Sequence, residues 1–245
     1  MSGGRLPDVD RYTERRPPAP TGELLTRVWA RRVDTPPAGV ARVVPDACAD
    51  IIWHRATGAL FVAGPDTAAR LASTAPGEMV GARFRSGHAP AGLGVPADVL
   101  RDQQVPLDAL WEAGRVARLA EGLHGTTSAA EAQDVLAASV LDGVRTGPDP
   151  AVPALLALAG AGRRVSAMAE EIGLTERQVH RRCLAAFGYG AKVLARVLRF
   201  QNALRLARQG TGLADVAHRC GYADQAHLSR EVRALAGVPL TALVG

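Results

Sequence analysis

The sequence predicts an α+β protein with a β-rich N-terminal part and an all-helical C-terminal third. Two observations lead to this prediction. Between residues 24 and 87, short β-favouring runs alternate with proline and glycine, which is typical of antiparallel hairpins rather than βαβ units. Beyond residue 150, apolar residues recur at helical spacing to the end of the chain. We therefore expect a small antiparallel β barrel or sandwich with two flanking helices, followed by a helical domain.

The β-rich part contains candidate strands at residues 24–33, 42–44, 50–53, 60–63 and 79–84. Proline and glycine between these runs, as at Pro36, Pro37 and Gly39, favour turns between neighbouring strands. After Pro96 the apolar residues follow a helical period, first over residues 107–119 and then over 135–141. We expect these two segments to be helices that flank the strands.

The composition is that of a globular protein. Of the 245 residues, 47% are hydrophobic and 22% are charged, and the mean hydropathy is +0.02. The longest weakly polar run, residues 151–162, is too short for a transmembrane helix and contains Pro153. Residues 1–20 carry charges and prolines where a secretion signal would have an apolar region. We therefore expect a cytoplasmic protein with no membrane partner.

The cysteines give no sign of a disulfide framework or a zinc site. Cys48, Cys183 and Cys220 are odd in number, widely spaced and without a Cys-x-x-Cys pair. The histidines of the β-rich part form no His-x-His pair and lack a glutamate at a suitable spacing. We expect no metal and no other cofactor.

Positive charge is concentrated in the C-terminal third. Residues 163–245 contain 13 Lys and Arg against 6 Asp and Glu, a net charge of +7, whereas the whole chain carries +5. The first 162 residues therefore carry a net charge of −2. A basic module of this size is typical of proteins that neutralise the phosphates of nucleic acid, although a solvated arginine-rich surface would give the same composition.

The basic third contains an internal repeat. Residues 169–173 align with 217–221 at an offset of 48, and the offset then becomes 49. At the second offset Thr175 falls on Asp224, and Gly188 falls on Gly237. Each copy has the pattern of a short helix, a glycine turn, a second helix and a glycine stop. The sequence therefore predicts two helix-turn-helix units.

The start of each second helix is marked by a capping residue. Thr175 begins a capping box with Gln178, and Asp224 is the equivalent N-cap. Between the units, residues 191–209 contain no glycine or proline and predict one helix of roughly 30 Å at about 1.5 Å per residue. This length is close to one turn of B-DNA, so the two second helices could reach successive major grooves.

These residues resemble the DNA-binding domain of the AraC/XylS family of transcription regulators over about residues 163–245. The matching residues of the first unit are Arg177, Val179, Arg181, Phe187, Gly188, Lys192, Leu194, Arg196, Arg199, Ala203 and Leu206. In the second unit the match covers residues 214–217, 220–225 and 237–239. Leu228 and Val232 stand where the family usually has phenylalanine, and Leu243-Val244 replaces its usual Tyr-Arg.

The N-terminal part is similar to the sensor domains of certain actinobacterial-type AraC regulators. The similar stretches are residues 44–52, 63–67, 81–84 and 95–111. The resemblance implies a cupin-like β barrel with a helical dimerisation pair. It also implies a small-molecule effector, but it does not identify one.

The resemblance and the repeat together define the expected domains. We expect a tail at residues 1–20, a β-rich sensor and dimerisation domain at 21–147, a linker at 148–162 and an AraC-type DNA-binding domain at 163–245. The expected function is that of a sequence-specific transcription regulator that binds double-stranded DNA. A homodimer through the helices within residues 98–146 is expected, and a contact with RNA polymerase is left open.

The candidate DNA contacts lie on the exposed sides of the two second helices and on flanking basic residues. Arginine can donate two hydrogen bonds to guanine, and glutamine can pair with adenine. The second-helix candidates are Glu176, Arg177, His180, Arg181, Gln225, Ser229 and Arg230. Arg163, Arg164, Lys192 and Arg196 are expected to meet phosphates or structural carboxylates. The alternative for the arginines is an intraprotein ion pair, such as Arg181 with Glu176 or Arg230 with Glu231.

Four residues of the β-rich part are candidates for a small-molecule pocket, namely Asp46, Asp50, Trp53 and Arg83. They would supply an aromatic wall and a few convergent polar groups. The alternative is that they cap turns and pack the sheet.

Two other functions remain open from the sequence. A thiol-dependent enzyme or alkyl-transfer protein would need a hyper-reactive cysteine, for which Cys48 is the candidate because Cys183 and Cys220 fall at apolar positions of the repeat. The other possible function is that of a DNA-binding protein that responds to no ligand. We expect no enzyme activity, since the sequence lacks a Gly-x-Ser-x-Gly motif and a metal-binding pattern.

Overall fold

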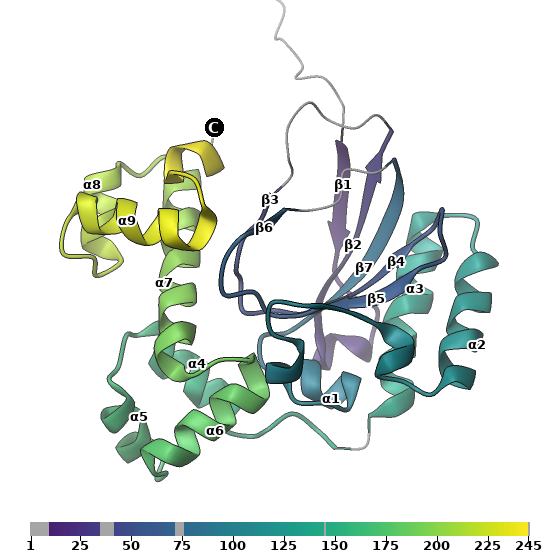
Figure 1. The fold of residues 1–245 in the computed structure, drawn as a ribbon, viewed down its shortest axis with the longest axis horizontal. Helices are drawn as coiled ribbons and strands as arrows, with labels where there is room; N and C mark the ends of the chain where they lie inside the picture. The colour runs from purple at the N-terminus through teal and green to yellow at the C-terminus, as the bar shows by residue number, and fades with distance from the viewer. Residues whose placement is uncertain (1–9, 35–41, 72–75, 145, 245) are drawn as a thin grey trace, which may run out of the picture.

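The computed structural model describes residues 10–34, 42–71, 76–144 and 146–244, and it contains a sheet domain beside a helical domain (Figure 1). The N-terminal domain is an antiparallel sheet with helices on one face, and the C-terminal domain is helical. The predicted α+β fold class is therefore confirmed.

The main sheet has six strands in the order β1-β2-β7-β4-β5-β8. Their bounds are β1 Asp10–Arg15, β2 Leu25–Val33, β7 Gly77–Phe84, β4 Asp50–His54, β5 Leu60–Ala63 and β8 Gln104–Pro106. A separate two-stranded sheet pairs β3 (Arg42–Val43) with β6 (Arg70–Leu71). Each of the five predicted runs contains one strand. The expected tail holds β1, which pairs with β2 along its whole length, while residues 1–9 lie outside the described residues.

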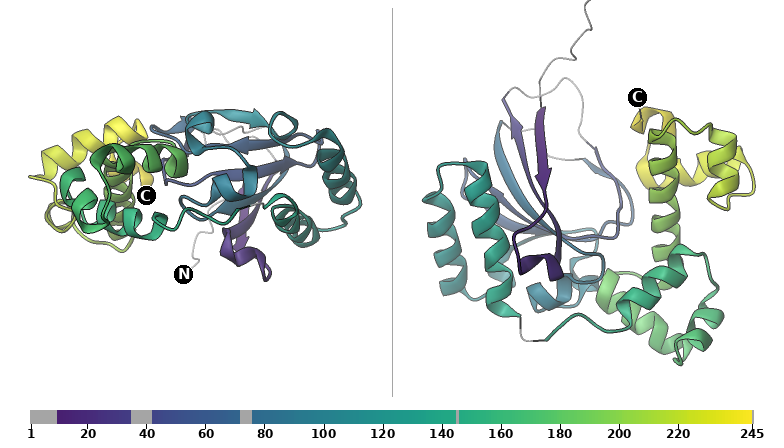
Figure 2. Two further views of the ribbon diagram at one scale, coloured as in Figure 1. Left: turned by 90° about the horizontal axis from the view of Figure 1, so that it is seen from below. Right: turned by 180° about the vertical axis from the view of Figure 1, so that it is seen from behind.

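Strict alternation of side chains gives the main sheet two different faces. Val28, Ile51, Trp53, Ala82 and other residues of one face form the core with the helices. The helices on this face are α1 (Ala89–Leu93), α2 (Ala113–His124) and α3 (Ala129–Ser139). Both views of Figure 2 place α2 and α3 beyond the sheet, away from the helical domain. The opposite face carries a smaller apolar cluster around Trp29, Ile52 and Ala63.

The helical domain contains two helix-turn-helix units that share one long helix. The first consists of α4 (Val152–Gly160), α5 (Val165–Glu171) and α6 (Glu176–Phe187), and the second of α8 (Leu213–Arg219) and α9 (Gln225–Ala236). Between them runs α7 (Ala191–Arg208), as the spacing predicted. Short 3-10 helices lie at η1 Thr21–Glu23, η2 Ala97–Leu100, η3 Leu107–Ala109, η4 Leu141–Gly143 and η5 Leu240–Leu243.

The segment expected as a linker, residues 148–162, contains helix α4. Pro153 lies in its first turn, where proline is compatible with a helix. Asp149 Oδ1 accepts a hydrogen bond from the Ala151 amide at 2.9 Å, just before the helix begins. Val152 and Leu155 are fully buried in the core of the first helix-turn-helix unit. The segment is therefore part of the helical domain's core.

Leu228 and Val232, which replace the phenylalanines usual in the resembling family, are 1% and 0% exposed. They pack with Phe200, Leu204 and Leu235 in the core of the second unit. Smaller side chains therefore still fill this core. Within the described residues, no helix is long and apolar enough to cross a bilayer.

Candidate DNA interface and sensor-domain site

The N-terminus of each second helix is fixed by the predicted capping residue. At α6 the Thr175 hydroxyl accepts from the Gln178 amide at 3.2 Å, and Gln178 Oε1 accepts from the Thr175 amide at 2.8 Å. At α9 the Asp224 carboxylate accepts from the His227 amide at 2.6 Å. Both caps are confirmed. They define where each helix starts and therefore which residues occupy its outer face.

The buried and exposed sides of α6 and α9 are those that the repeat predicts. Val179 and Cys183 of α6 are 0% exposed, as is Val232 of α9. On the outer sides, Glu176, Arg177, His180, Arg181, Gln225 and Arg230 are exposed, and Ser229 is half-buried. Neither Arg181 with Glu176 nor Arg230 with Glu231 forms an ion pair within the described part of the chain. Both arginines are therefore available to a partner.

A basic groove of about 880 Å³ lies beside α7, between the two units. Its basic lining residues are Arg163, Arg164, Lys192, Arg196, Arg199 and Arg219, and Glu176 is its one acidic residue. A second hollow of about 580 Å³ adjoins α6 and is lined by Arg177, His180 and Lys192. Lys192 lines both. The exposed outer face of α6 is thus continuous with a positively charged groove, which suits a phosphate backbone.

Arg196 and Arg199 also make contacts within the protein. Arg196 Nε lies 2.7 Å from Glu231 Oε2, and Arg199 Nη2 lies 3.7 Å from the same atom. Arg199 stacks over Tyr222 at 4.5 Å from the ring centroid. Of the two alternatives considered for Arg196, a phosphate or a structural carboxylate, the structure provides the carboxylate. The pair joins α7 to α9.

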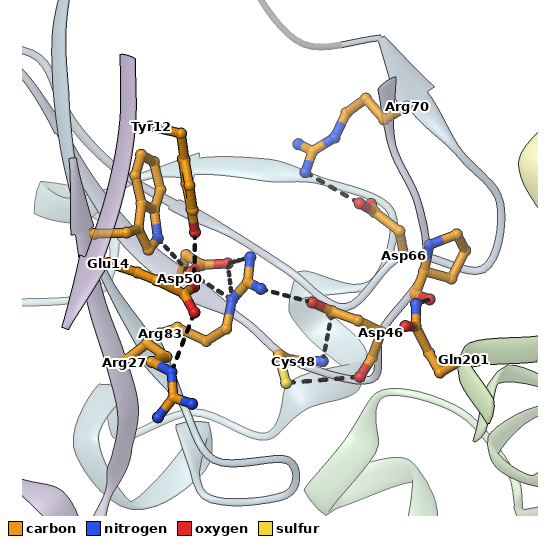
Figure 3. A network of polar contacts seen from close by, with 12 residues as sticks. Tyr12, Glu14, Arg27, Asp46, Cys48, Asp50, Asp66, Arg70, Arg83 and Gln201 are labelled. Atoms are coloured by element: carbon orange, nitrogen blue, oxygen red, sulfur yellow. Dashed lines mark hydrogen bonds and ion pairs between the residues drawn. The ribbon is translucent and has the colours of Figure 1, made fainter. Parts of the chain in front are cut away.

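On the face of the sheet opposite helices α1 to α3, Arg83 brings two of the predicted ligand-binding carboxylates together (Figure 3). Arg83 Nη1 lies 3.1 Å from Asp46 Oδ2, and Arg83 Nε lies 3.1 Å from Asp50 Oδ1. The Trp29 indole donates to Asp50 Oδ1 at 2.8 Å. Tyr12 stacks on Trp29 with ring centroids 6.1 Å apart. Three of the four candidates therefore share one polar cluster.

Trp53, the fourth candidate, lies on the other face of the sheet, so its predicted place in this pocket is wrong. It is 0% exposed in the core beneath the helices and meets His124 edge-on. Positions 50 and 53 of one strand are an odd number of residues apart, so their side chains point to opposite faces. The aromatic wall of the cluster is formed by Trp29 and Tyr12. The sequence did contain a signal for the position of Trp29. Gly81 lies inside a strand pattern, and glycine there indicates that another group approaches the backbone closely. A Cβ there would lie 2.1 Å from Trp29 Cε2.

Burial shifts the pKa of two groups at this cluster, Asp46 and Cys48. It raises the pKa of Asp46, with Arg83 acting in the opposite direction. Burial likewise raises the pKa of the Cys48 thiol well above its usual range, and the Asp46 carboxylate adds to the effect. Cys48 therefore has the environment of a protonated thiol. Within the described residues, no group of three or more His, Cys, Asp or Glu is placed to hold a metal ion.

Two segments of the chain match known protein families. Residues 168–244 match a family described as a helix-turn-helix domain, and residues 13–106 match a domain of unknown function, DUF6597. No curated protein matches the sequence significantly.

Among solved structures, the chain is similar to ToxT from Vibrio cholerae. The crystal structure of ToxT from strain O395 is 12% identical, with 96% of this chain and 98% of that chain covered and a TM-score of 0.44. Wild-type ToxT from strain SCE256, bound to an unsaturated fatty acid, is 10% identical, with coverages of 96% and 94% and a TM-score of 0.46.

Proposed function

We propose that this chain, a DNA-binding regulator whose residues 168–244 form an AraC-type helix-turn-helix domain, reads two neighbouring major-groove sites with α6 and α9. The observation that carries the proposal is the pair of capped helices whose outer faces are exposed on one continuous domain. Helix α7 has 18 residues and is therefore about 27 Å long, comparable to one turn of B-DNA.

The side chains divide into two roles. Arg177, His180 and Arg181 of α6, with Gln225, Ser229 and Arg230 of α9, are proposed to contact base edges, and Glu176 can accept from cytosine. Arg164 and Lys192 are proposed to contact phosphates through the basic groove, together with Arg163. Arg196 is proposed to approach a phosphate from its ion pair with Glu231. Base contacts would give sequence preference, and phosphate contacts would give affinity.

The N-terminal domain is proposed to bind a small-molecule effector on the face of its sheet opposite helices α1 to α3. Asp46, Asp50 and Arg83 supply polar groups there, and Trp29 supplies an aromatic surface. An effector acts only if it binds two conformations of the protein with different affinities. The cluster includes Asp46, whose neighbours Pro45 and Ala47 contact the helical domain. An effector that binds Arg83 would therefore act on the part of the chain that contacts the helical domain.

A thiol-dependent enzyme is less well supported. It would need a thiolate at Cys48, whereas burial and the Asp46 carboxylate raise the pKa of this thiol. We therefore propose a regulator without enzyme activity. A homodimer, a contact with RNA polymerase and a cytoplasmic location remain parts of the same proposal.

The test is selection of binding sites from random duplex DNA by the full chain, followed by mobility shift with single variants. Arg181→Ala and Arg230→Ala should each weaken the selected site by about 1–3 kcal/mol and relax the preference at one position. Arg16→Ala, which removes an exposed arginine just after β1, is the charge-matched control. Unchanged affinity and preference in both variants would exclude the proposed readout.

A further inference from the structure

The two helix-turn-helix units have separate cores, and α7 contributes side chains to both. The core of the first unit ends on this helix at Val197, and the core of the second begins at Phe200. At this junction Arg196 and Arg199 link α7 to α9 through their ion pairing with Glu231. The separation of α6 and α9 therefore depends on how α7 bends and on any other element that spans both cores.

A segment of the sensor domain spans both cores. Val44 packs against the core of the second unit, while Ala47 is 2% exposed and belongs to the core of the first. Between them, the Pro45 carbonyl accepts a hydrogen bond from the Gln201 side chain, near the middle of α7. Residues 44–47 thus run beside α7 and connect the same two cores that α7 connects.

The C-terminal ends of α6 and α9 are also held by the sensor domain. Helix α6 ends at Gly188, whose carbonyl accepts from Arg101 Nη1 at 3.3 Å and whose Cα faces Pro65. Near the end of α9, the Leu235 carbonyl accepts from the Ala69 amide at 2.6 Å. Gly188 and Gly237 are equivalent in the internal repeat, and a Cβ on Gly237 would lie 3.0 Å from Arg42 Nη1. Equivalent ends of both helices therefore rest on the sensor domain.

One ion pair ties Asp46 to the main sheet, and a second orders the segment that follows β5. Arg83 on β7 binds Asp46, and Arg70 Nη2 lies 3.1 Å from Asp66 Oδ2 (Figure 3). Asp46 also accepts from the Cys48 amide at 3.0 Å, which orders the chain between the helical domain and β4. The contacts on the helical domain are thus continuous with the main sheet.

We propose that residues 44–47 and 65–69, which we call the interdomain strut, fix the separation of α6 and α9 and so determine the half-site spacing that the protein accepts. In this role Pro45, Ala47 and Ala69 are positioning residues that never touch DNA. The inference deepens the proposed function and rests on it for its consequence on DNA.

The first test measures the distance between the helices without DNA. In the full chain, an amino acid with a keto group replaces residues 181 and 230, and spin labels are attached to these two keto groups. The three cysteines therefore stay unlabelled and intact. The double variant Arg101→Ala/Gln201→Ala removes two side-chain contacts between the sensor domain and the helical domain without changing a core residue, and the contact of Gln201 is to the strut itself. We expect one narrow distance distribution for the parent protein and a broader one for this variant. The control, Arg16→Ala/Arg32→Ala, changes two exposed arginines away from the helical domain and should match the parent.

A second variant, Ala47→Asp, places a charge in the core of the first unit and should broaden the distribution further. A distribution in Arg101→Ala/Gln201→Ala as narrow as that of the parent, at the same mean distance, would overturn the proposal whether or not Ala47→Asp folds.

The second test uses duplexes selected by the parent protein, with one base pair inserted or removed between the two half-sites. The parent should lose about tenfold or more in affinity, and the double variant markedly less. Equal losses of affinity in the parent and in the double variant would argue against the proposed role of the strut. Failure of the parent to select any two-part site would instead refute the proposed function, and the distance measurement would still decide the strut.

Discussion

Arg70 Nη2 lies 3.1 Å from Asp66 Oδ2, yet burial raises the pKa of this carboxyl to about 6. The arginine lowers the pKa, but the loss of hydration of the carboxylate outweighs that effect. Asp66 is 7% exposed and lies in the segment that contacts the helical domain. Its ionisation is therefore linked to the stability of the interdomain contact.

The first prediction concerns this carboxyl and pH. In the unfolded chain Asp66 ionises near its ordinary pKa of 3.8, but in the folded protein it ionises at about 6. The folded state binds more protons between these values, so the free energy of unfolding should fall as pH rises from about 4 to 6 and then level off. The loss due to Asp66 should be on the order of 1–2 kcal/mol after allowance for solvent screening. Urea unfolding across this range measures it.

Asp66→Asn should flatten the curve in this window. Asp34→Asn, at an exposed carboxyl paired with Arg32, is the control and should leave the slope unchanged. An identical pH slope in Asp66→Asn and in the parent protein would contradict the assignment.

The second prediction compares two glycines with the same backbone requirement. Gly173 and Gly188 have φ values of +64° and +81°, so alanine is strained at both and should cost about 1 kcal/mol. A Cβ at Gly173 meets nothing within 4 Å, whereas a Cβ at Gly188 would lie 2.7 Å from Pro65 Cγ and 3.0 Å from the Ala97 carbonyl oxygen.

Gly188→Ala should therefore lower the free energy of unfolding by about 1–3 kcal/mol more than Gly173→Ala. Chemical denaturation of the two variants side by side gives this difference. Equal destabilisation of the two variants would mean that the sensor domain does not pack closely against the C-terminal end of α6.

The sequence predicted those features that depend on local chemistry. Thr175 and Asp224 could be identified as helix caps because capping needs only residues two or three positions away. The strand β1 was missed because Arg11 to Arg15 lack an apolar pattern, and the strand forms by pairing with β2. Residues 148–162 were expected as a linker, although the helical spacing of apolar residues beyond residue 150 already included α4 and proline is allowed in a first turn.

The candidate sensor site depended on longer-range geometry. Asp46, Asp50 and Arg83 were identified by residue type, and the pairing of β4 with β7 sets Asp50 opposite Arg83. Trp53 was grouped with them by residue type, although strand alternation puts positions 50 and 53 on opposite faces, and it packs in the core as the alternative expected. Trp29 was missed because its contact with Asp50 crosses β7 at Gly81, and only the strand order reveals that crossing.

The third prediction concerns the Cys48 thiol. Because burial and the Asp46 carboxylate raise its pKa, little thiolate should exist at neutral pH. Cys183 and Cys220 are buried whereas Cys48 is half-buried, and burial raises the pKa of Cys183 to about 11. Labelling of the native protein with a disulfide reagent at pH 7 should therefore be slower than labelling of free N-acetylcysteine, and Cys48→Ser should retain DNA binding. If Cys48 reacted faster than the free thiol, that result would support a thiol-dependent enzyme instead.

The fourth prediction separates affinity from sequence preference. Lys192 is exposed and lines both the basic groove and the hollow beside α6, so we propose that it meets a phosphate. Neutralising a phosphate releases condensed counterions, and each such contact contributes close to one unit to the slope of log affinity against log salt. Lys192→Ala should therefore reduce the slope by about 1 and weaken selected and unrelated duplexes equally. Titrations of both duplexes at salt concentrations from about 50 to about 200 mM measure this slope. Arg16→Ala removes the same charge from the sensor domain and should leave the slope unchanged. A loss of affinity confined to the selected duplex would instead place Lys192 at a base edge.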